Sequence, residues 1–205
     1  MTYDLIIFDL DGTLADSFPF FVSVHNQLAD RHGFRRIQPA EIGPLRTLGA
    51  REVMRHVGLP RWKLPLVARS FVQLMREADV RLFDGVGDAL ESLHRRGAAL
   101  ALVTSNASDN CRRILGDAHW RRLAHAECGA SIFGKRRRIA RVLGKTGTPP
   151  RRAIYVGDQT TDAEAARAAG VAFGAVAWGY GTPQSLQHLR PDHLFHHVDE
   201  LAMLA

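Results

Sequence analysis

Two aspartates, Asp9 and Asp11, stand where a short apolar run ends, and they are the residues best placed to do chemistry. Gly12 follows them and permits a tight turn, so both carboxylates can point into one site. Two like charges so close together are costly unless a cation neutralises them, which favours a hard, oxygen-seeking ion such as Mg²⁺. The alternative is a plain surface turn, because Asp-Gly is a common turn pair.

A second polar segment, Thr104-Ser105-Asn106, follows the apolar run 99–103 and precedes a helical pattern. Hydroxyl groups and free backbone N–H groups at the start of a helix form a site for an anion. Serine and asparagine are also ordinary helix-capping residues, and taken alone this segment leaves that alternative open.

Three charged residues complete the set. Lys135 begins an expected helix, where its ammonium could hold a phosphate, although a solvated surface lysine is the alternative. Asp158 ends an apolar run and Asp162 falls in the helical turn after it, so together they could complete a metal site or cap that helix. The polar segments all occur at strand ends or at a helix start, which favours one shared site.

The hydrophobic pattern predicts an α/β fold. Short apolar runs predict strands at 3–8, 99–103, 124–128, 153–156 and 171–177, and a weak strand at 193–198. Amphipathic patterns predict helices at 86–96, 109–115, 135–143 and 162–169. This alternation implies a Rossmann-like parallel sheet with helices on both faces. Because ligands bind at the carboxyl ends of the strands in such sheets, the polar segments lie where a site is expected.

Residues 16–80 interrupt this alternation with helical patterns only, expected at 17–33, 41–48, 51–57 and 62–78. We therefore expect a core domain of residues 1–15 and 81–205 and a small α-helical cap domain of residues 16–80, inserted after the first strand. Arg46 and Arg51 in this insert could reach a carboxylate or a second phosphate of a substrate, or stay solvated.

The sequence resembles the haloacid dehalogenase superfamily of phosphotransferases, in its phosphoglycolate-phosphatase-like branch. The resemblance rests on the run Asp9-Leu10-Asp11-Gly12-Thr13-Leu14 followed by Asp16-Ser17, on Ser105-Asn106, on Lys135, and on Gly157-Asp158 with Asp162 and the run 165–170 after it. It covers nearly the whole chain, and the helical insert lies where this branch carries its cap.

The resemblance implies a magnesium-dependent phosphatase that hydrolyses a small-molecule phosphate monoester, such as phosphoglycolate or a sugar phosphate. Asp9 would be the nucleophile that forms an aspartyl-phosphate. Asp11 would protonate the leaving alcohol and then activate water, and Thr13 would orient these two aspartates. This mechanism splits one difficult hydrolysis into two easier displacements.

The resemblance also implies how phosphate and metal are held. The phosphoryl oxygens would be bound by Lys135 and by the segment Thr104-Ser105-Asn106. The expected Mg²⁺ ligands are Asp9, Asp11 (including its backbone carbonyl) and Asp158, with Asp162 as a ligand or a neighbour of one.

Composition limits the partners. Apolar residues make up 46% and charged residues 23% of the 205 residues, which is typical of a globular protein. The net charge of +6 favours anionic ligands, but the basic cluster 135–138 has no interleaved aromatic residues, so we do not expect nucleic-acid binding. No apolar run is long enough to cross a membrane and no signal peptide is recognised, so we expect a cytoplasmic monomer or homodimer. Cys111 and Cys128 are expected to be free thiols, with a disulfide between them as the alternative.

Other functions remain alternatives at this stage. A related phosphotransferase or phosphomutase would return phosphate to a sugar, and a phosphonate hydrolase would need Lys63, the only lysine of the cap, for a Schiff base. A non-catalytic binding protein on the same scaffold is a third alternative. The segment Gly144-Lys145-Thr146 lacks the first glycine of a P-loop, and the histidines near residue 195 fit a loose surface cluster better than a metal site.

Overall fold

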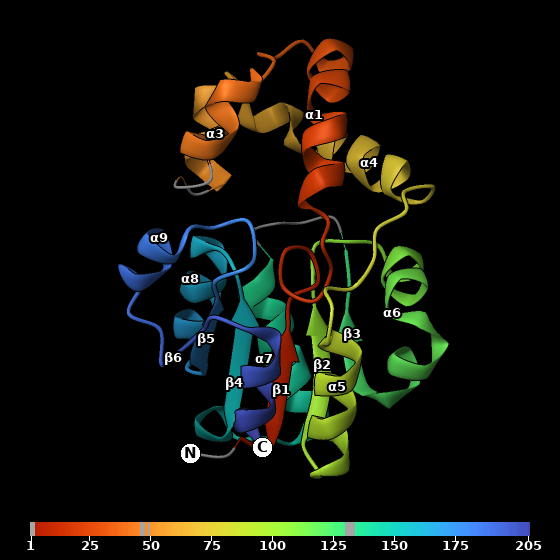
Figure 1. Cartoon of the computed structure of the whole chain (residues 1–205), viewed down its shortest axis with the longest axis vertical. Helices are drawn as coiled ribbons and strands as arrows, with labels where there is room; N and C mark the ends of the chain where they lie inside the picture. The colour runs from red at the N-terminus through yellow and green to blue at the C-terminus, as the bar shows by residue number, and fades with distance from the viewer. Residues whose placement is uncertain (1–2, 46–47, 49, 130–133) are drawn as a thin grey trace.

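Six parallel strands form the centre of the molecule, in the order β3-β2-β1-β4-β5-β6 (Figure 1). The computed structural model of the chain describes residues 3–45, 48, 50–129 and 134–205. The strands are β1 Leu5–Phe8, β2 Ala99–Val103, β3 Leu123–Glu127, β4 Ala153–Gly157, β5 Ala172–Val176 and β6 His193–Phe195. The sheet and the helices on its two faces confirm the expected α/β class.

The central strands are apolar on both sides because helices cover both faces of the sheet. Leu5 and Ile7 of β1 join one hydrophobic core, and Ile6 and Phe8 join the other. Phe8 pairs in register with Leu102 of β2 and with Val156 of β4. The three strands therefore end at nearly the same level, and the residues that follow them become neighbours at one edge of the sheet.

Two layers of helices enclose the sheet. One core contains side chains of α5 Val86–Arg95, α6 Ser108–Arg122 and the 3₁₀ segment η4 Val198–Leu204. The other contains side chains of α7 Lys135–Thr146, α8 Thr160–Ala169 and α9 Pro183–Gln187. A short 3₁₀ turn, η3 Pro150–Arg152, leads into β4.

Two helical predictions for the core were incomplete. The helix expected at 109–115 continues as α6 to Arg122, past a non-helical residue, Gly116, whose φ is 74°. A glycine in that conformation normally ends a helix. The helical pattern in the sequence therefore ends at this glycine, although the helix continues beyond it. The five-residue α9 was not expected, because so short a segment shows no clear period.

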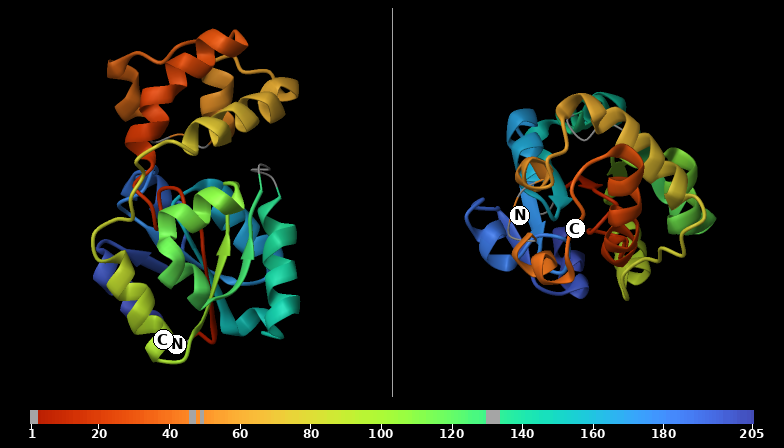
Figure 2. Two further views of the ribbon diagram at one scale, coloured as in Figure 1. Left: turned by 90° about the vertical axis from the view of Figure 1, so that its right-hand side faces the viewer. Right: turned by 90° about the horizontal axis from the view of Figure 1, so that it is seen from above.

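Four further helices lie above the carboxyl edge of the sheet (Figures 1 and 2). They are α1 Phe18–His32, α2 Ile42–Leu45, α3 Ala50–His56 and α4 Leu64–Met75, with the 3₁₀ turns η1 Pro39–Glu41 and η2 Arg61–Lys63 before α2 and α4. We call these helices and turns the cap helices. Within the described residues, the helix expected at 41–48 is the turn α2, with the 3₁₀ turn η1 directly before it.

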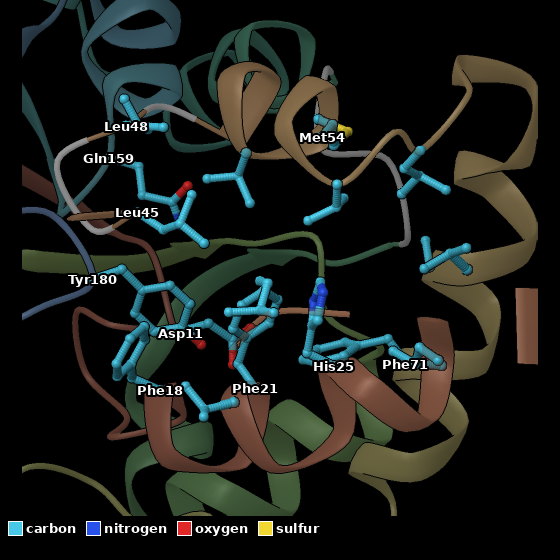
Figure 3. Close-up of a pocket in the computed structure, with 18 of the residues that line it drawn as sticks. Asp11, Phe18, Phe21, His25, Leu45, Leu48, Met54, Phe71, Gln159 and Tyr180 are labelled. Carbon is cyan, nitrogen blue, oxygen red and sulfur yellow. The ribbon is translucent and has the colours of Figure 1, made fainter. Parts of the chain in front are cut away.

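A cavity of about 730 Å³ lies between the cap helices and the carboxyl edge of the sheet (Figure 3). Its walls come from α1, α3 and α4, and from the loops that follow β1, β2, β4 and β5. Within the described part of the chain, no helix has the length and apolar character needed to span a bilayer. The Sγ atoms of the free thiols Cys111 and Cys128 lie 3.7 Å apart, beside the sheet.

Candidate active site

Asp9 is the first residue after β1, and the sheet holds its main chain in place. Its N–H donates a hydrogen bond to the Val156 carbonyl of β4 over 2.9 Å, which continues the parallel ladder. The Asp9 side chain is buried, and its Oδ1 accepts a hydrogen bond of 2.8 Å from the Leu10 N–H. The other oxygen, Oδ2, stays available to a partner from elsewhere in the chain.

The turn after Asp9 depends on Gly12. The φ of Gly12 is 78°, and a Cβ there would come within 2.4 Å of Oδ2 of Asp158 and 2.6 Å of a ring carbon of Tyr180. Glycine is therefore needed both for the backbone conformation and for the space. The next residue, Thr13, donates its hydroxyl to Oδ1 of Asp158 over 3.2 Å. The hydroxyl expected to orient Asp9 and Asp11 thus contacts Asp158.

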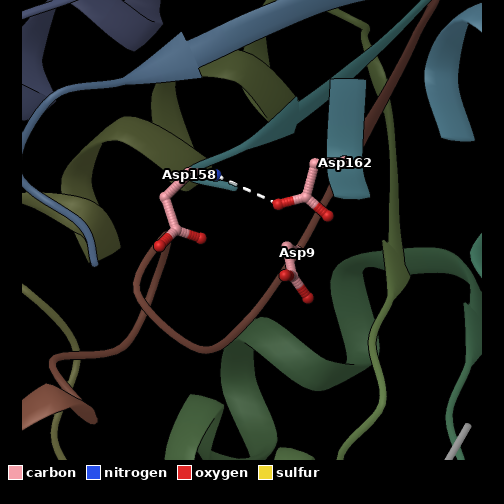
Figure 4. Close-up of side chains that lie close together, drawn as sticks. All are labelled: Asp9, Asp158 and Asp162. Atoms are coloured by element: carbon pink, nitrogen blue, oxygen red, sulfur yellow. Dashed lines mark hydrogen bonds between the residues drawn. The ribbon is translucent and has the colours of Figure 1, made fainter. Parts of the chain in front are cut away.

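Three buried aspartates meet at this edge of the sheet (Figure 4). Asp9, Asp158 and Asp162 each offer a carboxylate oxygen, and these three oxygens lie within 4.8 Å of one another. Carboxylate oxygens are the ligands that Mg²⁺ prefers, so the donor set fits that ion. The Asp11 carboxylate lies outside this group, which leaves the main-chain carbonyl of Asp11 for the metal role expected of that residue.

Lys135, at the start of α7, joins two of these carboxylates. Its Nζ donates to Oδ2 of Asp9 and to Oδ1 of Asp162, at 2.5 Å in each case. The Lys135 side chain is itself buried. The lysine expected to carry a point charge to the site therefore lies against the expected nucleophile, and the solvated-surface alternative is excluded.

Asp162 has two roles in the structure. Its Oδ2 accepts hydrogen bonds from the N–H groups of Asp158 and Gln159, at 3.2 and 3.0 Å, and so closes a capping box at the start of α8. Its Oδ1 faces Lys135. The helix-capping alternative is thus correct for Asp162, and the same carboxylate also belongs to the acidic group. Asp158 does not cap α8, because its Oδ2 accepts the Tyr180 N–H at 2.8 Å.

Asp11 faces the loop that follows β2. The Nδ2 of Asn106 donates to Oδ2 of Asp11 over 3.1 Å, while Oδ1 of Asn106 accepts from Ala107 and Asn110. These bonds hold the Asn106 amide firmly between α6 and Asp11. The predicted neighbourhood of Asp11 and the second polar segment is therefore present.

Of the remaining residues expected to bind substrate, only some lie in the cavity wall that the structure describes. Ser105 lines the cavity, whereas the hydroxyl of Thr104 accepts the Asn106 N–H at 3.1 Å and serves the loop itself. Arg46 lies outside the described residues. Arg51 lies on α3, but its side chain is not among those that the structure describes.

Burial controls the electrostatics of the site. It raises the pKa of Asp9 to about 7, although Lys135 offsets part of the rise. It also raises the pKa of Asp11, and it raises that of Asp158 well above the ordinary range. Burial alone would lower the pKa of Lys135, but the carboxylates of Asp162 and Asp9 outweigh it and raise that pKa. A cation among these carboxylates would favour their charged forms. A divalent ion bound there would therefore offset the cost of burying them.

Comparison with known proteins decides the family. The sequence matches the haloacid dehalogenase-like hydrolases over residues 6–176, a range that includes every residue of the site described above except Tyr180. The chain belongs to this family. A curated relative, the phosphoglycolate phosphatase of Synechococcus elongatus, is 35% identical over 202 residues, which cover 96% of this chain and 94% of the relative. This haloacid dehalogenase-like hydrolase is thus a phosphatase of the phosphoglycolate-phosphatase-like branch, as the motifs indicated.

Three further similarities accompany that assignment. The tyrosine-protein kinase PtkA of Mycobacterium tuberculosis is 35% identical over 188 residues, which cover 86% of this chain and 63% of the kinase. A solved structure from Lactobacillus plantarum shares the fold, with a TM-score of 0.83 and 23% identity over the whole of both chains. The crystal structure of CbbY from Rhodobacter sphaeroides, which contains phosphate, has a TM-score of 0.72 and 23% identity over 98% of this chain and 96% of that one.

Sequence reasoning missed one residue of this hydrolase's site, Tyr180. It follows β5, its N–H holds Asp158, and its hydroxyl hydrogen-bonds with Ser17 over 2.8 Å. The available signal was the glycine on each side of it. A Cβ at Gly179 would lie 2.3 Å from both the Asp158 Cβ and the Gly12 carbonyl, so only glycine permits this close approach.

Proposed function

We propose that this hydrolase is a magnesium-dependent phosphatase in which Asp9 attacks the phosphorus of a small-molecule phosphate monoester. One observation carries the proposal: the buried ammonium of Lys135 contacts Asp9, and the carboxylates of Asp158 and Asp162 lie beside it. A nucleophile, a fixed cation and two metal-ligating acids are the parts that phosphoryl transfer needs. The name of the Synechococcus relative supports a phosphate monoester as substrate.

The buried aspartates would hold the ion. Asp9, Asp158 and Asp162 would contribute carboxylate oxygens, and Asp11 its main-chain carbonyl. When bound, Mg²⁺ supplies positive charge that offsets the charge of the phosphoryl oxygens. Thr13 and the Tyr180 N–H each bond one oxygen of Asp158 and so fix its orientation for this task.

Lys135, Ser105 and Asn106 would bind the phosphoryl group. Lys135 already contacts Oδ2 of Asp9, so a phosphoryl group transferred to that carboxylate would meet the ammonium directly. Ser105 lies in the cavity wall, and the Asn106 amide is fixed beside Asp11. Groups held in place before the reaction stabilise developing charge without having to reorganise.

Two displacements complete the reaction. A carboxylate oxygen of Asp9 forms a bond to phosphorus while the bond from phosphorus to the alcohol oxygen breaks, and Asp11 gives that oxygen its proton. Asp11 then takes a proton from water as the water oxygen attacks phosphorus. The bond between Asp9 and phosphorus breaks, which restores the carboxylate and releases inorganic phosphate.

The surroundings of Asp11 suit this use. Burial raises its pKa, which favours the protonated form required in the first displacement. The hydrogen bond from Asn106 keeps the carboxyl group at the edge of the cavity, where the alcohol would leave. Asp11 can therefore reach the leaving oxygen without entering the group of metal-ligating carboxylates.

Phosphate release from a panel of monoesters, with Mg²⁺ and after chelation, tests the proposal. We expect turnover that needs Mg²⁺ and a loss of at least about 1,000-fold in Asp9→Asn, in which a weak amide replaces the nucleophile. Asp16→Asn, at an exposed position of the same segment, should retain activity. Full activity of Asp9→Asn, or an absence of turnover by the wild type, would refute the proposal.

Two competing reactions are distinguished by their products. Phosphomutase or kinase activity would place phosphate on a sugar or a protein, so analysis with labelled substrate would find the label there and not in inorganic phosphate.

A phosphonate hydrolase would need Lys63 in the site. Instead, Nζ of Lys63 donates to the His32 carbonyl at the end of α1 over 2.6 Å, and Lys63 is absent from the described cavity wall.

A further inference from the structure

The cavity is most polar at the end beside the carboxylates. Asp11, Ser105, Asn106 and Asp158 line that end. Above them the described wall consists mainly of aliphatic and aromatic side chains of the cap helices, among them Phe21, Leu45, Val53, Met54 and Phe71. A phosphate ester bound by Asp9 would therefore direct its alcohol part into an apolar space.

A continuous aromatic wall joins the two ends. Tyr180, whose N–H holds Asp158, lies with its ring centre 5.1 Å from that of Phe18 and 5.9 Å from that of Phe21. The ring of Phe21 lies 5.8 Å from that of His25. Figure 3 shows these side chains lining one side of the cavity. The alcohol part of an ester would lie along this wall.

The described wall of this space offers little to a second negative charge on a small substrate. Among the lining residues that the structure describes, only Arg61 carries a permanent positive charge. A carboxylate moved from water into an apolar wall without a partner loses much of its solvation. The volume of about 730 Å³ lies within the range of sites for ligands much larger than a two-carbon ester.

A buried histidine also lies in the cap part of this wall. His25 projects from α1 into the cavity (Figure 3), and its side chain is buried, with 7% exposure. Among the buried side-chain nitrogen and oxygen atoms of the described residues, only Nε2 of His25 has no hydrogen-bond partner. A buried polar atom without a partner costs stability, so a ligand that completes its hydrogen bond gains affinity.

We infer that the substrate is a phosphate ester whose alcohol part is largely apolar and carries one polar group, which hydrogen-bonds Nε2 of His25. This inference rests on the proposed function and specifies its substrate class. The phosphoryl group is held at Asp9, the apolar part lies against Phe21 and the cap helices, and the polar group reaches His25.

A series of straight-chain alkyl phosphates tests the apolar part. Their leaving alcohols are chemically alike, so differences in kcat/KM report contacts with the alcohol part. We expect kcat/KM to rise about two- to fourfold per added methylene from ethyl to hexyl phosphate, the upper value corresponding to complete burial. We also expect hexyl phosphate to exceed phosphoglycolate at least tenfold. Equal rates along the series, or a preference for phosphoglycolate, would overturn the inference and leave the phosphatase proposal intact. Release of phosphate from none of the esters would refute both.

The role of His25 is tested by esters that end in a hydroxyl. Wild-type kcat/KM is compared for alkyl and ω-hydroxyalkyl phosphates of four to eight carbons. We expect the hydroxyl to raise kcat/KM at one chain length. At that length, His25→Phe should lower the ratio of kcat/KM for the hydroxyalkyl ester to kcat/KM for the alkyl ester at least fivefold. His32→Phe, on the same helix but outside the described cavity wall, should keep the wild-type ratio. An unchanged ratio in His25→Phe at every length would overturn the role of His25.

A second variant does not depend on His25. Met54→Lys places a cation in the apolar wall, so hexyl phosphate should lose at least fivefold in kcat/KM while phosphoglycolate gains. Leu66→Lys is the matched control, because Leu66 is 52% exposed on α4 and is not among the described lining residues. Equal effects of the two lysines on both esters would contradict an apolar site for the alcohol part.

Discussion

The ammonium of Lys135 donates a hydrogen bond to the carboxylate of Asp9 over 2.5 Å, although 126 positions separate the two residues in the chain. The bond joins the start of α7 to the end of β1. As far as the chain is described, Lys135 is the only cation paired with the buried aspartates, and it contacts Asp9 and Asp162. The same pair therefore links two elements of the fold and belongs to the proposed chemistry.

Replacing Lys135 should abolish most of the activity. We expect kcat to fall about 100- to 1,000-fold in Lys135→Ala, because a fixed cation beside the transferred phosphoryl group is lost. Steady-state phosphate release measures the effect. Lys145→Ala, at an exposed position of the same helix, is the matched control and should keep wild-type kcat. Activity of Lys135→Ala within threefold of the wild type would show that the ammonium is not part of the reaction.

The turn at Gly12 should not tolerate alanine. Gly12→Ala would strain a residue with φ of 78° and force its Cβ against Asp158, so we expect a loss of about 1–3 kcal/mol in the free energy of unfolding. The displaced Asp158 should also lower activity. Gly144→Ala provides the comparison, since no atom lies within 4 Å of a Cβ there and α7 should gain about 0.5–1 kcal/mol. Urea unfolding of both variants measures these changes. If Gly12→Ala and Gly144→Ala changed the free energy of unfolding alike, the turn geometry would be contradicted.

Magnesium should stabilise the folded protein through the acidic group. An ion that binds only the folded state at one hundred times its Kd adds about 2.7 kcal/mol to the free energy of unfolding. We expect a rise in melting temperature with Mg²⁺ that is much smaller in Asp158→Asn, which removes one charged ligand. Glu77→Gln, at an exposed position outside the site, should respond like the wild type. A wild-type response in Asp158→Asn would remove Asp158 from the metal site.

Stability should fall in mild acid because of His25. Burial lowers the pKa of His25 below its ordinary value of 6.5, and the Arg35 backbone offsets only part of the shift. The folded state therefore favours the neutral ring, so this contribution to stability is complete above pH 6.5 and is lost as the pH falls below it. Urea unfolding at pH 7.5 and 5.5 should show a smaller decrease for His25→Phe than for the wild type. His94→Phe, at an exposed position of α5, should show the wild-type decrease, and an equal decrease in all three proteins would contradict the assignment.

Several features follow from the sequence because they depend on local pattern. The apolar runs of β1, β2 and β4 are buried on both faces, so their hydrophobicity alone marks them as central strands. Parallel strands end at a common edge, and the polar residues that follow them therefore converge. For this reason the α/β class and the neighbourhood of Asp9 and Asp158 could be predicted, and the family was recognisable from its motifs.

Other features arise only when distant segments meet. Thr13 bonds Asp158, Tyr180 closes the site behind Gly12, and Asp162 divides its two oxygens between α8 and Lys135. No local pattern specifies these partners, because a side chain selects among neighbours that the folded backbone brings near. The cavity is the clearest case. Each cap helix has an apolar stripe that would suit a packed core, and only the tertiary structure leaves those stripes facing one another around an open space with His25 in its wall.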